Sequence, residues 1–318
     1  MIRTLARRLP RPLRELIRRL LRRYRSARYR IRERIRPTAL GVAEVEAALR
    51  ECGLEEGDSC FMQAAMSAFG SFEQGPGTVI EALERVVGER GLIAMPAYPL
   101  TGVAIEHLGG DPVFDVRSTP SRMGAISEVF RASPATLRSL HPTHSTCARG
   151  PAAAAIVAGH ETAAAPFGEG TPFPRIVERD ALQLFFGCGT GAITMYHSFE
   201  CTRRPPFPLD VFADRVFDAR CLDRAGDELR VRTLVHNPRL APGRIDTNPR
   251  LQAIFRERIL AFGGRAVRLG RGEIIAVRLP RLFEVFEDLL ARGITIYDVR
   301  LPADPPRVPP QDRVTTAS

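Results

Sequence analysis

The first 36 residues place apolar side chains at helical spacing among arginines. Leucine, isoleucine and tyrosine recur every three to four residues from Leu9 to Tyr24, as in an amphipathic helix whose other face is basic. Such a helix could lie on an anionic membrane surface. A mobile or mis-started extension is an equal alternative. We therefore predict a basic amphipathic N-terminal extension over residues 1–36, with both interpretations open.

From Pro37 onward, helical and strand patterns alternate along the chain. The glycine-punctuated segment Gly70 to Gly77 separates the first strand from the helix that follows it. This order is typical of an α/β unit, in which ligands bind at the carboxyl ends of the strands. The predicted elements are a helix over 42–52, a strand over 60–64, a helix over 78–87 closed by Gly88, and a strand over 92–95.

The remaining patterns complete one globular body over residues 37–301. Short alternating stretches at 211–217 and 229–235 indicate antiparallel strands. The fold class is therefore α/β, with a mixed central sheet flanked by helices and added antiparallel strands in the C-terminal half. Proline and charge predict a disordered tail over 302–318. The other predicted elements are helices over 120–131 (capped by Ser118 or Thr119), 152–160, 251–261 and 281–291, and strands over 182–187, 274–277 and 295–299.

The charge is concentrated at one end of the chain. Residues 1–36 carry 15 arginines against Glu15 and Glu33, a net +13, whereas the whole chain carries +10. The remaining residues therefore carry a net charge of −3, so the body of the protein is mildly acidic. No basic patch continues into the body, so we expect no nucleic-acid partner.

Cysteine spacing and hydropathy limit the class of protein further. The six cysteines contain no Cys-x-x-Cys pair, so we expect reduced thiols and no metal site. No apolar run of about 18 residues is present, and arginines continue where a signal peptide would need its apolar segment. We expect a cytoplasmic protein, with peripheral membrane contact through residues 1–36 as one option.

The segment from Arg138 to Gly150 collects reactive side chains in a loop. It holds His141, His144 and Ser145 together with Cys147 between proline and glycine, and loops of this kind often carry sites. Taken alone, His141 fits a core or capping histidine better than a catalytic one. A Cys–His hydrolase that uses Cys147 with His141 or His144 is a further, weaker alternative.

A second segment leaves a strand through glycines and enters a helix. Gly187, Gly189 and Gly191 precede His197 and Glu200, which are three residues apart. Residues at this spacing share a helix face, so the carboxylate can hydrogen-bond the imidazole. A histidine oriented in this way is suited to act as a general base. The alternative is a solvated ion pair.

Together with other segments, these residues resemble the aminoglycoside 3-N-acetyltransferases. The resemblance covers roughly residues 40–292, and the order and spacing of its motifs make it specific. The glycine loop from Gly70 to Leu83, the Met95-Pro96 step and the segment Gly270 to Leu290 also fit. The motifs are Ser121-Arg-Met-Gly124, Phe130-Arg131, Arg138-Ser-Leu-His141-Pro142, Ser145, Gly150-Pro151, His160, Gly168-Glu-Gly170-Thr-Pro172, Gly187, Gly189, His197 and Glu200.

The resemblance implies acetyl transfer from acetyl-CoA to an amine of an aminoglycoside or related aminosugar, without a metal. His197, oriented by Glu200, would take the proton from the attacking amine, and His141 with Ser145 would line the junction of thioester and amine. An oligomer is compatible with this activity. The residues implied for coenzyme binding are Ser67, Ala68, Phe69, Gly70, Gly77 and Thr78, the last two at a helix start that suits phosphates.

Three departures from the family pattern concern the thioester and substrate sides. Gln63-Ala64-Ala65 stands where the family has His-Ser-Ser, Thr190-Gly191 where it has His-Asp, and Ala97 where it has threonine. They leave open a non-catalytic relative that binds acyl-CoA. They also leave open an N-acyltransferase of surface-polysaccharide aminosugars rather than a resistance enzyme.

A polycationic acceptor would need acidic side chains around it. Asp210, Asp214 and Asp218 could supply them, although their spacing equally fits a solvated surface. His236 stands where the family often has an acidic stretch that ends in histidine. We therefore take Asp210 and His236 as candidates for the substrate side.

Overall fold

The computed structural model describes residues 39–100, 102–299 and 301. The predicted extension over 1–36 and tail over 302–318 lie outside the described residues. Among the described residues, no helix has the length and apolar character needed to cross a bilayer.

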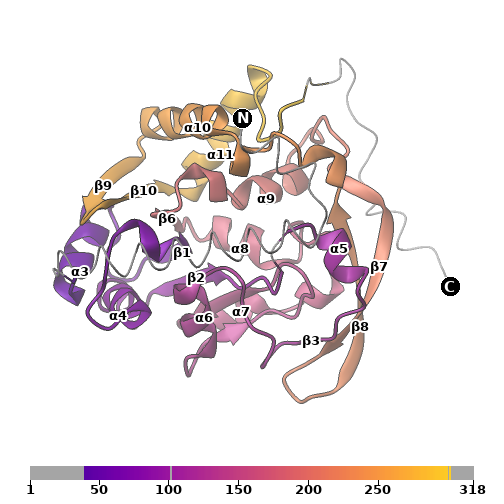
Figure 1. Ribbon diagram of the computed structural model, residues 1–318, viewed down its shortest axis with the longest axis horizontal. Helices are drawn as coiled ribbons and strands as arrows, with labels where there is room; N and C mark the ends of the chain where they lie inside the picture. Colours follow the sequence, from indigo (N-terminus) through magenta and orange to yellow (C-terminus); the bar gives the residue numbers. More distant parts are fainter. Residues whose placement is uncertain (1–38, 101, 300, 302–318) are drawn as a thin grey trace, which may run out of the picture.

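A seven-stranded mixed sheet forms the centre of the molecule (Figure 1), which confirms the predicted fold class. β1 pairs in parallel with both β2 and β6, and antiparallel neighbours extend the sheet on either side. In order across the sheet, the strands are β4 (Leu137–Arg138), β5 (Thr146–Arg149), β2 (Leu92–Pro96), β1 (Ser59–Ala64), β6 (Leu182–Phe186), β10 (Gly272–Arg278) and β9 (Arg265–Leu269).

Helices cover both faces of this sheet because its central strands are apolar on both sides. Phe61 points into one core, whereas Cys60 and Met62 point into the other, as successive strand residues do. The first core is covered by α7 (Ala153–Val157), α8 (Pro172–Glu178), α9 (Met195–Thr202), α10 (Pro249–Ala261) and α11 (Leu279–Ala291). The second core is covered by α3 (Val42–Glu51), α4 (Pro76–Val87) and α6 (Ala125–Ala132).

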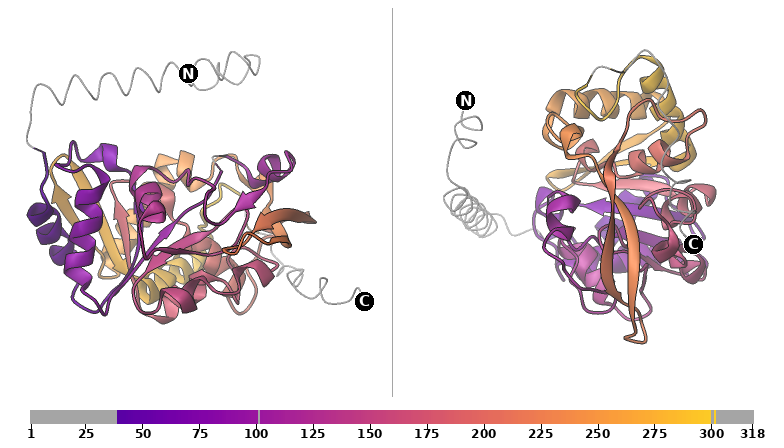
Figure 2. Two further views of the ribbon diagram at one scale, coloured as in Figure 1. Left: turned by 90° about the horizontal axis from the view of Figure 1, so that it is seen from below. Right: turned by 90° about the vertical axis from the view of Figure 1, so that its right-hand side faces the viewer.

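A smaller sheet lies at the end of the molecule opposite α3 and α4 (Figure 1). The strands β7 (Phe212–Leu222) and β8 (Glu228–His236) form a long antiparallel hairpin, as the sequence pattern predicts, and β3 (Phe114–Asp115) pairs with β7. The hairpin appears as a narrow ribbon in the right-hand view of Figure 2. The short helix α5 (Ala104–Leu108) packs against it. The last residue of β8 is His236, which pairs with Phe212 at the base of the hairpin, where β7 begins and β8 ends.

Two of the predicted helix boundaries are wrong for local backbone reasons. The helix predicted over 120–131 begins only at Ala125, because Gly124 has a φ of 108°. Its predicted cap, Thr119, instead accepts a hydrogen bond from the backbone of Asp115 at 2.8 Å. The helix predicted over 152–160 ends at Val157, because Gly159 is left-handed.

The strand predicted over 295–299 is not formed. The hydroxyl of Thr295 bonds both the backbone N–H and the carbonyl of Tyr297 at 3.1 Å. Such a local side-chain turn competes with strand pairing. Ile296 is nevertheless buried, and its carbonyl accepts a hydrogen bond from Ile245. In this segment the apolar pattern therefore indicates buried side chains and not a strand.

Candidate active site

The candidate site begins where the parallel strands β1 and β6 end at the same edge of the sheet. After β6 the chain turns through Gly187, whose φ is 71°. A side chain there would come within 2.5 Å of the Phe69 ring and 2.9 Å of the Ala65 carbonyl. Only glycine permits this approach. The turn leads through a short 3-10 helix (Thr190–Ala192) into α9.

His197 and Glu200 lie on one face of α9 and form the hydrogen bond that their spacing predicts. His197 Nδ1 is 2.8 Å from Glu200 Oε2. The Glu200 side chain is fully buried, whereas the His197 side chain is 14% exposed. Burial is the largest influence and raises the pKa of Glu200, but His197, with a smaller contribution from His236, outweighs burial and lowers this pKa. Glu200 is therefore an anion that fixes the ring of a partly accessible imidazole.

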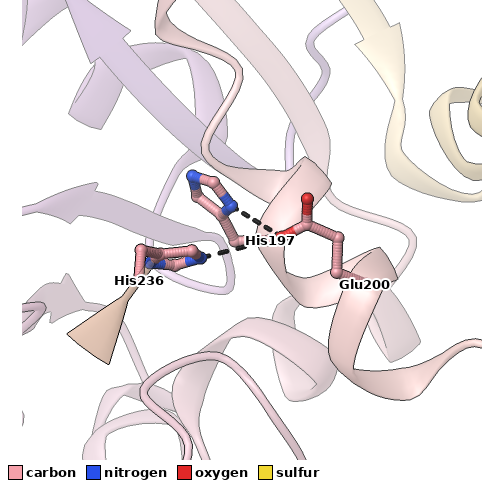
Figure 3. A group of neighbouring side chains, drawn as sticks. All are labelled: His197, Glu200 and His236. Carbon is pink, nitrogen blue, oxygen red and sulfur yellow. Dashed lines mark hydrogen bonds and ion pairs between the residues drawn. The ribbon is translucent and has the colours of Figure 1, made fainter. Parts of the chain in front are cut away.

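His236 joins this pair from the base of the β7–β8 hairpin (Figure 3). Its ring centroid is 4.1 Å from that of His197, and its Nε2 is 3.7 Å from Glu200 Oε2. This nitrogen is buried and makes no hydrogen bond to any described residue. Burial and the neighbouring His197 lower the pKa of His236 to about 4, so the ring is neutral at pH 7.

His141 lies in the same region but is held away from solvent. Its Nδ1 accepts hydrogen bonds from the backbone N–H groups of Thr143 at 3.3 Å and His144 at 3.1 Å. Its Nε2 therefore carries the proton and donates to Thr233 at 3.1 Å. Burial lowers the pKa of His141 well below its ordinary value. Both ring nitrogens are occupied within the protein.

Ser145 is equally enclosed. Its hydroxyl donates to the Ala97 carbonyl at 2.8 Å and accepts from Arg138 Nε at 3.0 Å. These bonds fasten the loop between β4 and β5 to the end of β2. Among the described aromatic rings, Phe167 and His236 pack against the His197 ring, whereas His144 and His160 pack against that of His141.

His144 is the residue that connects the two groups, and the sequence offered it only as a partner of Cys147. Its ring centroid is 6.2 Å from those of both His141 and His236. Tyr98 and Phe167 pack against it at 4.8 Å and 4.6 Å. The only signal in the sequence was its presence in the same loop as His141.

The residues implied for coenzyme binding divide into two groups. Ser67 is exposed on a 3-10 turn (Met66–Ala68) after β1, where Ala68 is half-buried. Phe69, in contrast, is a core residue whose ring lies 4.2 Å from that of Phe186, and its backbone N–H already donates to the Met66 carbonyl. The backbone of Gly70, with φ 122°, follows.

The second group lies in the first turn of α4. Thr78 is buried, and its hydroxyl accepts a hydrogen bond from the backbone of Gln74 at 2.9 Å. Gly77 is half-buried beside it. Gly75 precedes the helix, and a side chain added there would meet no described atom within 4 Å. The start of α4 is therefore accessible on this side.

Two of the three departures from the family pattern are used in internal contacts. Gln63 Nε2 donates to the Thr194 hydroxyl at 2.8 Å, at the start of α9. Thr190 is buried and donates to the Gln252 carbonyl at 2.8 Å. These side chains stabilise the loop and helix that carry His197.

Two further candidates from the sequence are Asp210, for the substrate side, and Cys147, for a cysteine hydrolase. Asp210 is exposed in the loop before β7. Cys147 is buried in β5, and burial raises the pKa of its thiol to about 12. A thiol in this state does not supply the thiolate that a cysteine hydrolase needs.

Comparison with known proteins identifies the family of this chain. A family model described as aminoglycoside 3-N-acetyltransferase matches residues 61–291. Aminoglycoside N(3)-acetyltransferase VII of Streptomyces paromomycinus is 34% identical over 173 residues, 50% of this chain and 59% of that protein. The type IX enzyme of Micromonospora chalcea is 30% identical over 173 residues, 50% of this chain and 60% of that protein. The chain thus matches about 60% of the length of these relatives.

Solved structures share the fold. The AAC-IIIb binary complex with CoASH has a TM-score of 0.66 and 24% identity. This match covers 80% of the present chain and 97% of the AAC-IIIb chain. Sisomicin-bound AAC-VIa has a TM-score of 0.65 and 25% identity. This match covers 80% of the present chain and 99% of the AAC-VIa chain. Since the family model extends over well more than half of the 318 residues, the chain belongs to the aminoglycoside 3-N-acetyltransferase family.

Proposed function

We propose that this protein transfers an acetyl group from acetyl-CoA to an amino group of an aminoglycoside or a related aminosugar. The observation that carries the proposal is the hydrogen bond of 2.8 Å between His197 and the buried Glu200. It supplies an oriented base at the carboxyl ends of the central strands, where ligands bind in α/β sheets.

In the proposed reaction, the anionic Glu200 accepts a hydrogen bond from His197 Nδ1–H, which leaves a lone pair on Nε2. As the amine attacks the thioester carbonyl, Nε2 takes its proton. The C–S bond then breaks and CoA leaves as the thiolate. General-base catalysis of this kind contributes about 10²–10⁴-fold in rate. The developing imidazolium is stabilised by the Glu200 carboxylate.

We further propose that acetyl-CoA binds along the backbone from Ser67 to Gly70 and at the start of α4, near Gly77 and Thr78. Helix N-termini provide unpaired N–H groups that suit phosphates. The open approach beside Gly75 and the CoASH complex of AAC-IIIb support this location. His141 and Ser145 would act as positioning residues, because their polar atoms hold the loop that borders the site.

A thiol-release assay with acetyl-CoA tests the proposal over a panel of aminoglycosides and aminosugars. His197→Ala should lower kcat about 10²–10⁴-fold. His107→Ala is the matched control, because His107 lies on α5, outside the histidine group, and should keep the rate. Unchanged thiol release in His197→Ala would overturn the assignment of the base.

A second candidate is an acetyltransferase for aminosugars that carry few positive charges. It is favoured because Gln63 and Thr190 bond within the protein, at positions where the family has groups suited to thioester and substrate. Asp210, the acidic candidate for the substrate side, is exposed before the hairpin. Turnover of amino-nucleotide sugars without turnover of kanamycin-like compounds would establish this candidate. Tight acyl-CoA binding without turnover of either class would instead indicate a non-catalytic relative.

A further inference from the structure

Three side chains at the candidate base form an arrangement that general-base catalysis does not require. Glu200 Oε2 lies 2.8 Å from His197 Nδ1 and 3.7 Å from His236 Nε2 (Figure 3), and the three potential ligand atoms all lie within 4.8 Å of one another. We propose that His197, Glu200 and His236 form a binding site for a transition-metal ion of the zinc type, and that this ion inhibits the enzyme.

The distances fit such an ion after small side-chain movements. Tetrahedral zinc with bonds of about 2.0–2.1 Å separates its ligand atoms by about 3.3 Å. The two separations from Glu200 Oε2, 2.8 Å and 3.7 Å, lie on either side of this value, and the two imidazole nitrogens lie within 4.8 Å of each other. Modest side-chain rotations would therefore bring the three atoms around one ion.

The donor set favours zinc and its neighbours over calcium or magnesium. Two imidazole nitrogens and one carboxylate oxygen suit Zn²⁺, Co²⁺ or Ni²⁺, whereas the alkaline-earth ions prefer oxygen ligands. Three protein ligands would leave a fourth position open for water.

Charge and unmet hydrogen bonding favour a cation at this place. Glu200 is a buried anion, and its Oε1, like His236 Nε2, makes no hydrogen bond to any described residue. Arg244 is the competing positive charge near Glu200, but it is paired with Asp246 at 2.8 Å. The side chains of His197 and His236 are 14% and 16% exposed, which provides a route of entry.

The inhibitory effect follows from which nitrogen of His197 binds the metal ion. The base requires the proton on Nδ1 of His197, bonded to Glu200, and the lone pair on Nε2. A metal ion on Nδ1 displaces that proton to solvent, and a neutral ring must then carry its proton on Nε2. Nε2 becomes a donor and cannot accept the proton of the amine. The consequence for activity rests on the proposed function, whereas metal binding does not.

The test uses the full chain without a histidine tag, first treated with a chelator and then dialysed. Titration calorimetry with Zn²⁺ should show one ion per chain, and Co²⁺ should give the absorption bands of a four- or five-coordinate site. His236→Gln should weaken Zn²⁺ binding at least about tenfold. His107→Gln, which changes a histidine outside the group, should leave it unchanged. Circular dichroism of each variant confirms folding.

Activity is measured on the same chelated samples. Zn²⁺ should suppress acetyl transfer in proportion to site occupancy, and a chelator should restore the rate. Absence of stoichiometric Zn²⁺ binding, or equal binding by His236→Gln, would overturn the site. Binding without loss of acetyl transfer would overturn the inhibition. A chelated protein that is inactive with every acceptor would refute the proposed function, while the binding measurements would still decide the metal site.

Discussion

At the scale of single residues, the charge of Glu200 is the least replaceable property of the site. The carboxylate has no exposed surface and is 2.8 Å from the imidazole that it orients. A buried anion is tolerated only where a partner compensates its lost hydration. Here His197 is the partner, and His236 is the next closest candidate.

Glu200→Gln should therefore lower kcat about 10²–10⁴-fold, because the neutral amide cannot stabilise an imidazolium and can hold the wrong tautomer. Steady-state thiol release measures the effect. Glu287→Gln is a matched control, since Glu287 only forms a surface ion pair with Arg203 at 2.9 Å. A Glu200→Gln enzyme with the parental kcat would exclude the oriented-base mechanism.

The His197 and Glu200 pair was predictable because both residues belong to one helix, where a spacing of three fixes their relation. His236 was predictable only as a substrate-side candidate. Its approach to within 4.1 Å of the His197 ring depends on how a separate sheet packs, which local patterns do not encode. His141 shows the opposite case, because composition does not distinguish an accessible imidazole from one whose two nitrogens are bonded internally.

At the scale of elements, the turn between β6 and α9 depends on the lack of a side chain at Gly187. The backbone has a φ of 71°, and a methyl group would overlap the Phe69 ring. The position therefore combines backbone strain with a steric clash.

Gly187→Ala should reduce the free energy of unfolding by about 2–5 kcal/mol, from left-handed strain and overpacking together. Urea denaturation monitored by circular dichroism gives the value. Gly263→Ala separates the two causes, because Gly263 has a φ of 87° but no described atom within 4 Å of the added methyl group. This control should lose only about 1–2 kcal/mol. Equal losses in the two variants would show that the contact with Phe69 does not matter.

Most long elements were predictable from apolar periodicity, with boundaries within a few residues. The exceptions have local causes. Thr295 bonds its own backbone neighbourhood instead of entering a strand, and Gly124 delays the start of α6. β5, with four residues, is too short to show a period of its own. Such outcomes depend on side-chain bonds and tertiary packing, which act beyond the window of a sequence pattern.

At the scale of the whole molecule, five of the six histidines gather in one group that several elements build. His141 stacks on His160 at 4.4 Å, and His144 links them to the pair of His236 and His197. Burial lowers the pKa of His160 from 6.5 to about 3. The fold therefore keeps imidazoles neutral that would be charged in an acidified unfolded chain.

Lowering the pH from 6.5 to about 3 should therefore destabilise the folded protein. Above pH 6.5 His160 is neutral in both states, and its contribution is constant. Between pH 6.5 and about 3, only the unfolded chain binds the proton, so the free energy of unfolding falls by about 1.4 kcal/mol per pH unit for this residue. Urea unfolding at pH 7, 6 and 5 measures the slope. His160→Gln should show a shallower slope than the parental protein; a slope equal to the parental one would contradict the assignment.

The division between α9 and the hairpin has a consequence for how the protein can evolve. Six of the eight residues of α9 are buried, so nearly every mutation in the helix that carries the base also disturbs the core. The β7–β8 hairpin, in contrast, exposes Asp214, Val216 and Asp218 along one strand and ends in His236. Under the proposed function, substitutions along the hairpin would change the surface that leads to His236 with little effect on the core, whereas substitutions in α9 would change both the core and the surroundings of His197.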